Sequence, residues 1–125
     1  MIIKNGEYLV EIIKNMKGGI GEFYIEHLVD EKMLGNAGRL FARGTLQPGH
    51  SVGWHIHAED MELCYILKGT GIIIDNDKKQ YNITQGDMHI CLPGDGHEII
   101  NNNDRPLVYM AIVLYPNCNK ENTIT

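Results

Sequence analysis

The stretch GHSVGWHIHAEDMELCYILKG, residues 49–69, holds two histidines two positions apart and a glutamate five positions after the second. Side chains at i and i+2 of a β-strand leave the same face, so His55 and His57 are expected to lie side by side. If the four residues that follow form the turn of a hairpin, Glu62 lies on the adjoining strand near this pair. The stretch therefore predicts two strands that bring two imidazoles and a carboxylate together.

A third imidazole is expected from His97, on a later strand that follows the turn at 93–96. Three neutral imidazoles and one carboxylate suit a divalent transition metal, with iron, manganese, zinc, nickel, cobalt and copper all compatible. In an octahedral site these four ligands would leave two adjacent positions open, as a substrate or dioxygen requires. The pattern predicts one such metal site and does not identify the metal.

Short β-prone segments separated by Gly, Asn, Asp and Pro surround this stretch. Many short strands with such turns are typical of an all-β sandwich or barrel. A short helical turn is expected within 30–38. Strands are expected at residues 7–13, 22–29, 39–46, 62–68, 70–75, 79–84, 88–92, 97–101 and 107–114.

The spacing Gly49-x5-His55-x-His57-x4-Glu62-x6-Gly69 resembles the first motif of the cupin superfamily without a departure. Two glycines at this spacing suit the turns that bound such a pair of strands.

A second set of residues resembles the second cupin motif: Gly86, Gly94, His97 and Asn101 stand at the family's offsets. The proline usual in that motif stands one place later, at Pro93. This small shift leaves the glycine-to-histidine spacing unchanged.

The resemblance implies a single-domain, cupin-type double-stranded β-helix, or jelly-roll barrel, over residues 1–115, with its motif core at 49–101. A polar C-terminal tail is expected at 116–125. The resemblance also implies that the metal lies inside the barrel, held by His55, His57, Glu62 and His97. Glu62 is a candidate acid or base as well as a ligand.

The resemblance implies a metal-dependent enzyme acting on a small organic acid, carbonyl compound or sugar derivative. Dioxygenase, decarboxylase, isomerase and lyase chemistry all remain open. Oxalate-decarboxylating cupins carry an arginine shortly before the first motif histidine, where this chain has Val52. A non-enzymatic module that binds or senses a small ligand, with a structural metal, is the alternative.

Composition excludes several classes of partner and of protein. The chain has 125 residues and a net charge of −5, which argues against a nucleic-acid binder that must neutralise phosphates. No apolar run approaches the length of a membrane span. Three cysteines without a CxxC pair argue against a disulfide scaffold, and a cytoplasmic protein is expected.

Strand parity suggests further pocket residues. Cys64 shares a face with Glu62 and is expected to point into the barrel. Arg43 would bind a carboxylate if it faces inward, and would be solvated or salt-bridged if it faces outward. Tyr109 offers a hydroxyl whose direction parity leaves open. These three are the candidate substrate-binding residues.

Parity also predicts that Met88, Ile90 and Leu92 face inward and that Cys91 faces outward. The remaining histidines, His27, His50 and His89, are expected at the surface or behind the ligands.

A single small barrel exposes edge strands, which proteins usually cover. The apolar, β-prone segment 1–13 therefore predicts a homodimer formed through sheet edges and this N-terminal strand.

Overall fold

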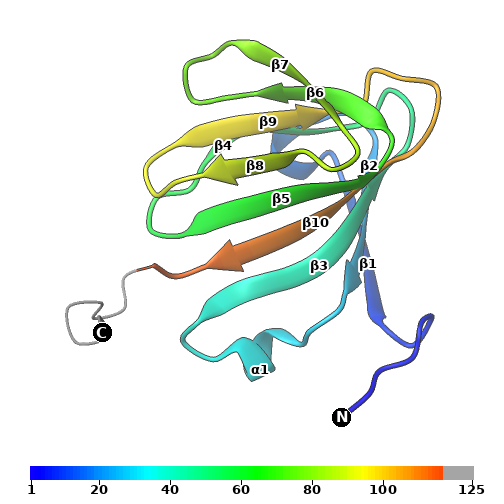
Figure 1. The fold of residues 1–125 in the computed structure, drawn as a ribbon, viewed down its shortest axis with the longest axis vertical. Helices are drawn as coiled ribbons and strands as arrows, with labels where there is room; N and C mark the ends of the chain where they lie inside the picture. Colours follow the sequence, from blue (N-terminus) through cyan, green and yellow to red (C-terminus); the bar gives the residue numbers. More distant parts are fainter. Residues whose placement is uncertain (117–125) are drawn as a thin grey trace.

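The computed structural model describes residues 1–116, and two antiparallel sheets pack face to face in it (Figure 1). The all-β, single-barrel fold expected from the sequence is confirmed. The six-stranded sheet has the order β1-β2-β3-β10-β5-β8, and the four-stranded sheet has the order β4-β9-β6-β7. The strands are β1 Leu9–Lys14, β2 Glu22–His27, β3 Gly38–Leu46, β4 Ser51–Ile56, β5 Met61–Lys68, β6 Thr70–Ile74, β7 Gln80–Thr84, β8 Met88–Cys91, β9 Gly96–Ile100 and β10 Leu107–Leu114.

Two helical elements interrupt the strands. The α-helix α1, Glu31–Leu34, begins at Asp30, whose carboxylate accepts a hydrogen bond from the Lys32 backbone N–H. Such a side-chain cap satisfies one of the free N–H groups at a helix start. A 3₁₀ turn at Met16–Gly18, which the sequence pattern did not predict, lies between β1 and β2. Among the described residues no helix has the length and apolar character that a membrane crossing demands.

The core fills the space between the sheets and follows the two-residue period of the strands. In β10, alternate residues from Leu107 to Val113 are buried. Tyr109 stacks on Phe23 of β2, with ring centroids 5.7 Å apart. Because inward residues are largely apolar and tightly packed, the few polar side chains among them are held in fixed positions.

Turn geometry closes the hairpins as the motif spacing implies. Gly69 joins β5 to β6 at φ +87°, and a Cβ there would lie 2.4 Å from the Pro106 carbonyl oxygen. Glycine is required at this turn, since any side chain would be strained and would clash with backbone. The tail expected at 116–125 lies outside the described residues except for Pro116.

Candidate metal centre

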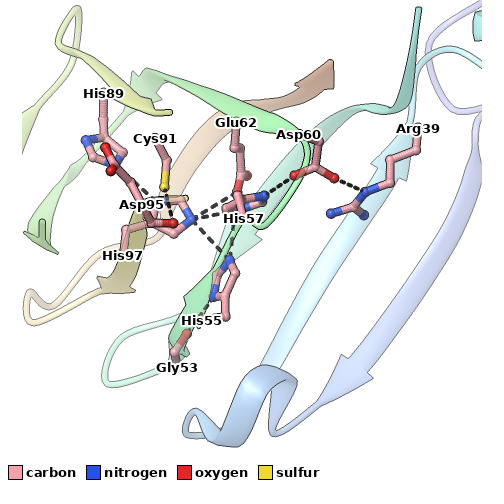
Figure 2. A network of polar contacts seen from close by, with 10 residues as sticks. All are labelled: Arg39, Gly53, His55, His57, Asp60, Glu62, His89, Cys91, Asp95 and His97. Carbon is pink, nitrogen blue, oxygen red and sulfur yellow. Dashed lines mark hydrogen bonds and ion pairs between the residues drawn. The ribbon is translucent and has the colours of Figure 1, made fainter. Parts of the chain in front are cut away.

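Four side chains from both sheets point toward one another (Figure 2). His55 of β4 lies directly opposite His97 of β9 in the antiparallel ladder. His57 follows the last residue of β4, and its backbone N–H donates to the Asp95 carbonyl over 2.9 Å, which extends the pairing. Glu62 comes from β5 in the other sheet. The residues that the sequence spacing singled out are therefore brought together by two sheets.

The four donor atoms converge on one point. The His97 Nε2 atom lies 3.2 Å from Nε2 of His57 and 3.1 Å from Nε2 of His55. The Glu62 Oε1 atom lies 3.0 Å from His57 Nε2, 3.1 Å from His97 Nε2 and 4.0 Å from His55 Nε2. One donor atom from each residue falls within 4.8 Å of all the others, so the group can hold a metal ion.

Burial and hydrogen bonds act against each other in setting the charge state of this cluster. Burial raises the pKa of Glu62, but hydrogen bonds with His57 and His97 lower it by more, to well below its usual range. Glu62 is therefore a carboxylate at neutral pH, which suits a ligand better than a general acid. Burial lowers the pKa of His55 and so favours its neutral form. For His57, hydrogen bonds to Glu62 and Asp60 outweigh burial and raise the pKa.

Each imidazole is held from behind at Nδ1. His55 Nδ1–H donates to the Gly53 carbonyl over 2.8 Å, and His57 Nδ1–H donates to Asp60 Oδ1 over 2.6 Å. The Nδ1 atom of His97 lies 3.0 Å from Nε2 of His89. Because the Gly53 and Asp60 partners only accept, the Nδ1 proton is fixed in His55 and His57, and in the neutral form of each ring the Nε2 lone pair faces the cluster.

Asp60 and Arg39 extend this support and were missed by sequence reasoning. Arg39 Nε donates to Asp60 Oδ2 over 2.7 Å. Strand parity would place Arg39 on the outer face with Phe41. Instead, β10 pairs Val113 with Leu40 and Leu114 with Gly38, so Arg39 is the extra residue of a β-bulge. Bulges of this kind re-aim a side chain, and a sequence pattern carries no signal for them.

The three candidate substrate-binding residues, Tyr109, Cys64 and Arg43, lie at different places relative to the cluster. Tyr109 lines the cavity beside the cluster, and burial raises its pKa well above the usual range, so its hydroxyl stays protonated. Cys64 is fully buried next to Glu62, as parity predicted, and burial raises its thiol pKa. Arg43 faces the other side of the sheet, where Nε and Nη2 donate to the Glu26 carboxylate over 2.7 and 2.9 Å. The structure does not bring Arg43 to the cluster.

The direction predicted for strand β8 is wrong. Cys91 is fully buried, whereas Met88, Ile90 and Leu92 are each about half exposed. The register explains the difference: β5 pairs Glu62 with Cys91, and directly opposed residues point to the same face. Apolar character alone misled the prediction, because the outer face of this edge strand is also apolar.

The same register turns His89 inward, where it forms a second group with Cys91 and His97 whose ligand atoms lie within 4.8 Å of one another. His89 thus stands behind a ligand position, one of the two alternatives considered. Burial raises the Cys91 thiol pKa to about 12, which opposes thiolate formation. The group with four donors is the better candidate, since its carboxylate is already ionised.

A cavity of about 520 Å³ opens beside the cluster, between the two sheets. His55, His57 and Glu62 form its polar end, and Arg39 lies on its wall. Its apolar wall is formed by Ile13, Met16, Phe23, Ile25, Leu40, Val52, Ile99, Tyr109 and Val113.

Comparisons with known proteins agree with this architecture. A family model described as "Cupin domain" matches residues 42–113. The oxalate-binding protein of Thermotoga maritima is 39% identical over 114 residues, which cover 91% of this chain and 93% of that protein. The crystal structure of a predicted oxalate decarboxylase from Thermotoga maritima has a TM-score of 0.87 at 38% identity, covering 92% of this chain and 99% of that one.

A more distant likeness concerns the fold alone. A polyketide cyclase from Streptomyces resistomycificus has a TM-score of 0.77 at 16% identity, covering 93% of this chain and 81% of that one.

Proposed function

Because this chain belongs to the cupin family, we propose that it is a mononuclear metal protein that binds a small organic acid and acts on it as an enzyme. In this proposal His55, His57, Glu62 and His97 hold one divalent transition metal ion.

The single observation that carries the proposal is the convergence of four donor atoms, three from imidazoles and one from a carboxylate, on one point. The Nδ1–H groups of His55 and His57 donate away from the cluster, so in their neutral forms both Nε2 atoms present lone pairs toward it. The ionised Glu62 carboxylate faces the same point. Imidazole N–H groups can donate to Glu62 at this point, and a divalent cation that displaces those protons would be held by the same four atoms.

The distances also fit an octahedral ion. Metal–ligand bonds of about 2.1 Å place adjacent ligands about 3.0 Å apart and opposite ligands about 4.2 Å apart. Separations of 3.0–3.2 Å occur between four pairs of donors, and the His55–Glu62 pair stands at 4.0 Å. His55, His57, Glu62 and His97 would hold such an ion and leave positions on it for a bound ligand.

An organic acid suits these positions, since carboxylate and carbonyl oxygens are good ligands for such ions. The name of the Thermotoga maritima relative, an oxalate-binding protein, supports the same ligand class. The arginine expected before the first histidine of oxalate-decarboxylating cupins is replaced by Val52, which lies on the cavity wall.

When bound, the metal would act as a Lewis acid or activate dioxygen, depending on its identity. The chain's own residues hold and shield the reacting molecule. Glu62, with its low pKa, stays ionised as a ligand, and the protonated Tyr109 hydroxyl can donate a hydrogen bond to an anion. The apolar wall limits the entry of water, which strengthens both interactions.

A non-enzymatic protein that binds an organic acid through a structural metal is the second candidate. The relative's name, which describes binding, favours it. A measurement of product formation distinguishes the enzyme from the non-enzymatic binding protein. Incubation of the metal-loaded protein with oxalate and with 2-oxo acids, followed by product analysis and oxygen uptake, gives products for an enzyme and none for a binding protein.

Metal analysis by plasma mass spectrometry tests the site itself on protein purified without an affinity tag. We expect about one transition metal ion per chain. The variants His57→Ala and His97→Ala should lose it, while His50→Ala, outside the cluster, should keep it. Metal absent from the wild type even after incubation with Fe²⁺, Mn²⁺ and Zn²⁺ would contradict the proposal.

A homodimer built from sheet edges and the N-terminal strand also remains a proposal. The two edge strands of the six-stranded sheet, β1 and β8, expose Leu9, Val10, Ile12, Met88 and Ile90. Unpaired strand edges with apolar side chains favour association. Sedimentation velocity at micromolar concentration should show a dimer, and a monomer would refute this part.

A further inference from the structure

The cavity beside the cluster is much larger than oxalate needs. Its volume of about 520 Å³ falls within the range of sites that enclose ligands of drug size. Oxalate has two carboxylates and no hydrocarbon, so it would leave the apolar wall without a partner. A well-matched ligand carries hydrocarbon between its polar ends.

Arg39 supplies a cationic group on the wall of this cavity. Its Nε is engaged by Asp60, and no hydrogen bond joins its two terminal nitrogens to the rest of the described residues (Figure 2). The bulge in β3 and the hydrogen bond to Asp60 hold the guanidinium in place. A guanidinium with two free NH2 groups is suited to a carboxylate.

The other charges around the cavity leave room for an anion. The carboxylates of Asp60 and Glu62 each lie within hydrogen-bond distance of His57, and Glu11 lies 2.6 Å from His27 Nε2. Glu31 and Glu59, also on the wall, are exposed to solvent, which screens them. Lys17 also lies on the wall, but of these two cations only Arg39, whose side chain is 44% exposed, is joined through Asp60 to the cluster, and its two terminal NH2 groups have no partner among the described residues.

The spacing between Arg39 and the cluster selects the length of the ligand. The Asp60 carboxylate and the His57 ring stand in line between them, joined by contacts of 2.7 and 2.6 Å. Figure 2 shows the guanidinium on the side of Asp60 away from the cluster. A ligand bound at the cluster must extend past a carboxylate and an imidazole to reach Arg39, which two-carbon oxalate cannot do.

We propose that Arg39 binds a second carboxylate of the ligand, and that this ligand is a dicarboxylic acid with a hydrocarbon segment between its two acid groups. One carboxylate occupies the free metal positions, the segment lies on the apolar wall, and the other carboxylate meets Arg39. This inference rests on the proposed metal site and specifies its ligand class.

A homologous series of acids tests the inference by calorimetry on protein loaded with Mn²⁺ and, in parallel, with Zn²⁺. The probes are oxalate, succinate, glutarate and adipate. We expect one of the longer acids to bind at least about tenfold more tightly than oxalate. Arg39→Gln should weaken the binding of that acid at least about tenfold and the binding of oxalate less than about threefold. The affinity of Arg39→Lys for that acid should lie between those of the wild type and Arg39→Gln. Arg105→Gln, a matched charge loss outside the cavity, should leave the affinity unchanged.

Three other results have distinct meanings. Tightest binding by oxalate, with equal effects of Arg39→Gln on all acids, would overturn the inference and leave the proposed function standing. Loss of the metal from Arg39→Gln, measured by plasma mass spectrometry, would assign Arg39 to the support of His57 and overturn it as well. No binding of any acid to the metal-loaded wild type would overturn both proposals.

Discussion

The hydrogen bond between Asp60 and His57 makes a quantitative prediction for metal affinity. Asp60 accepts from His57 Nδ1–H over 2.6 Å, and its other oxygen accepts from Arg39 over 2.7 Å. His57 is 4% exposed and Asp60 is 9% exposed, so water does not replace a lost partner easily. A carboxylate in this position fixes the ring orientation and makes the metal-binding nitrogen more basic.

The substitution Asp60→Asn keeps an acceptor oxygen and removes the charge, whereas Asp60→Ala removes both. Loss of such a partner weakens metal binding by about 10- to 100-fold, or about 1.4–2.7 kcal/mol. We expect Asp60→Asn near the lower figure and Asp60→Ala near the higher, because Ala also leaves His57 Nδ1–H without its partner.

Competition titrations of Zn²⁺ and Mn²⁺ against a chromophoric chelator measure the effect at pH 7.5. Asp104→Asn, the same substitution at an exposed position, is the matched control and should bind like the wild type. Circular dichroism verifies that each variant is folded. An affinity within about threefold of the wild type for a folded Asp60→Ala would refute the reasoning that Asp60 supports a metal ligand.

Three further predictions concern stability. In Gly53→Ala the new Cβ would lie 2.2 Å from the Lys17 carbonyl oxygen, so thermal unfolding should shift to a lower temperature, and an unchanged midpoint would contradict this backbone contact. Leu46→Ala empties a fully buried site and should cost about 2–5 kcal/mol in urea unfolding, whereas a loss below about 1 kcal/mol would place Leu46 outside the core. The hydrogen bond from Arg43 lowers the pKa of Glu26 from its ordinary 4.5, so its stabilisation is present above that pH and disappears as the pH falls through the lower folded-state value. Glu26→Gln should therefore be less stable than the wild type by up to about 1 kcal/mol at pH 7, and the difference should shrink as the pH falls below 4.5, whereas a pH-independent difference would refute the ion pair's role.

Local chemistry made the strands and the ligand set predictable. The two-residue period of segments such as Leu107–Leu114 marks strands that bury one face, and glycine turns such as Gly69 mark their ends. The spacing of His55, His57 and Glu62 places three donors on two consecutive strands and the residue that follows the first of them. These features depend on neighbours along the chain, so the amino-acid sequence by itself determined them.

Other features depend on pairing between distant strands, which only the tertiary structure decided. The bulge that turns Arg39 toward Asp60 exists because β3 pairs with β10, some 70 residues later in the chain. The inward direction of His89 and Cys91 follows from their register against β5. The contacts between the sheets then set the charges, since hydrogen bonds with His57 and His97, which come from the opposite sheet and its continuation, hold Glu62 ionised against the effect of burial. A linear pattern specifies which side chains alternate, whereas register specifies which face is inside.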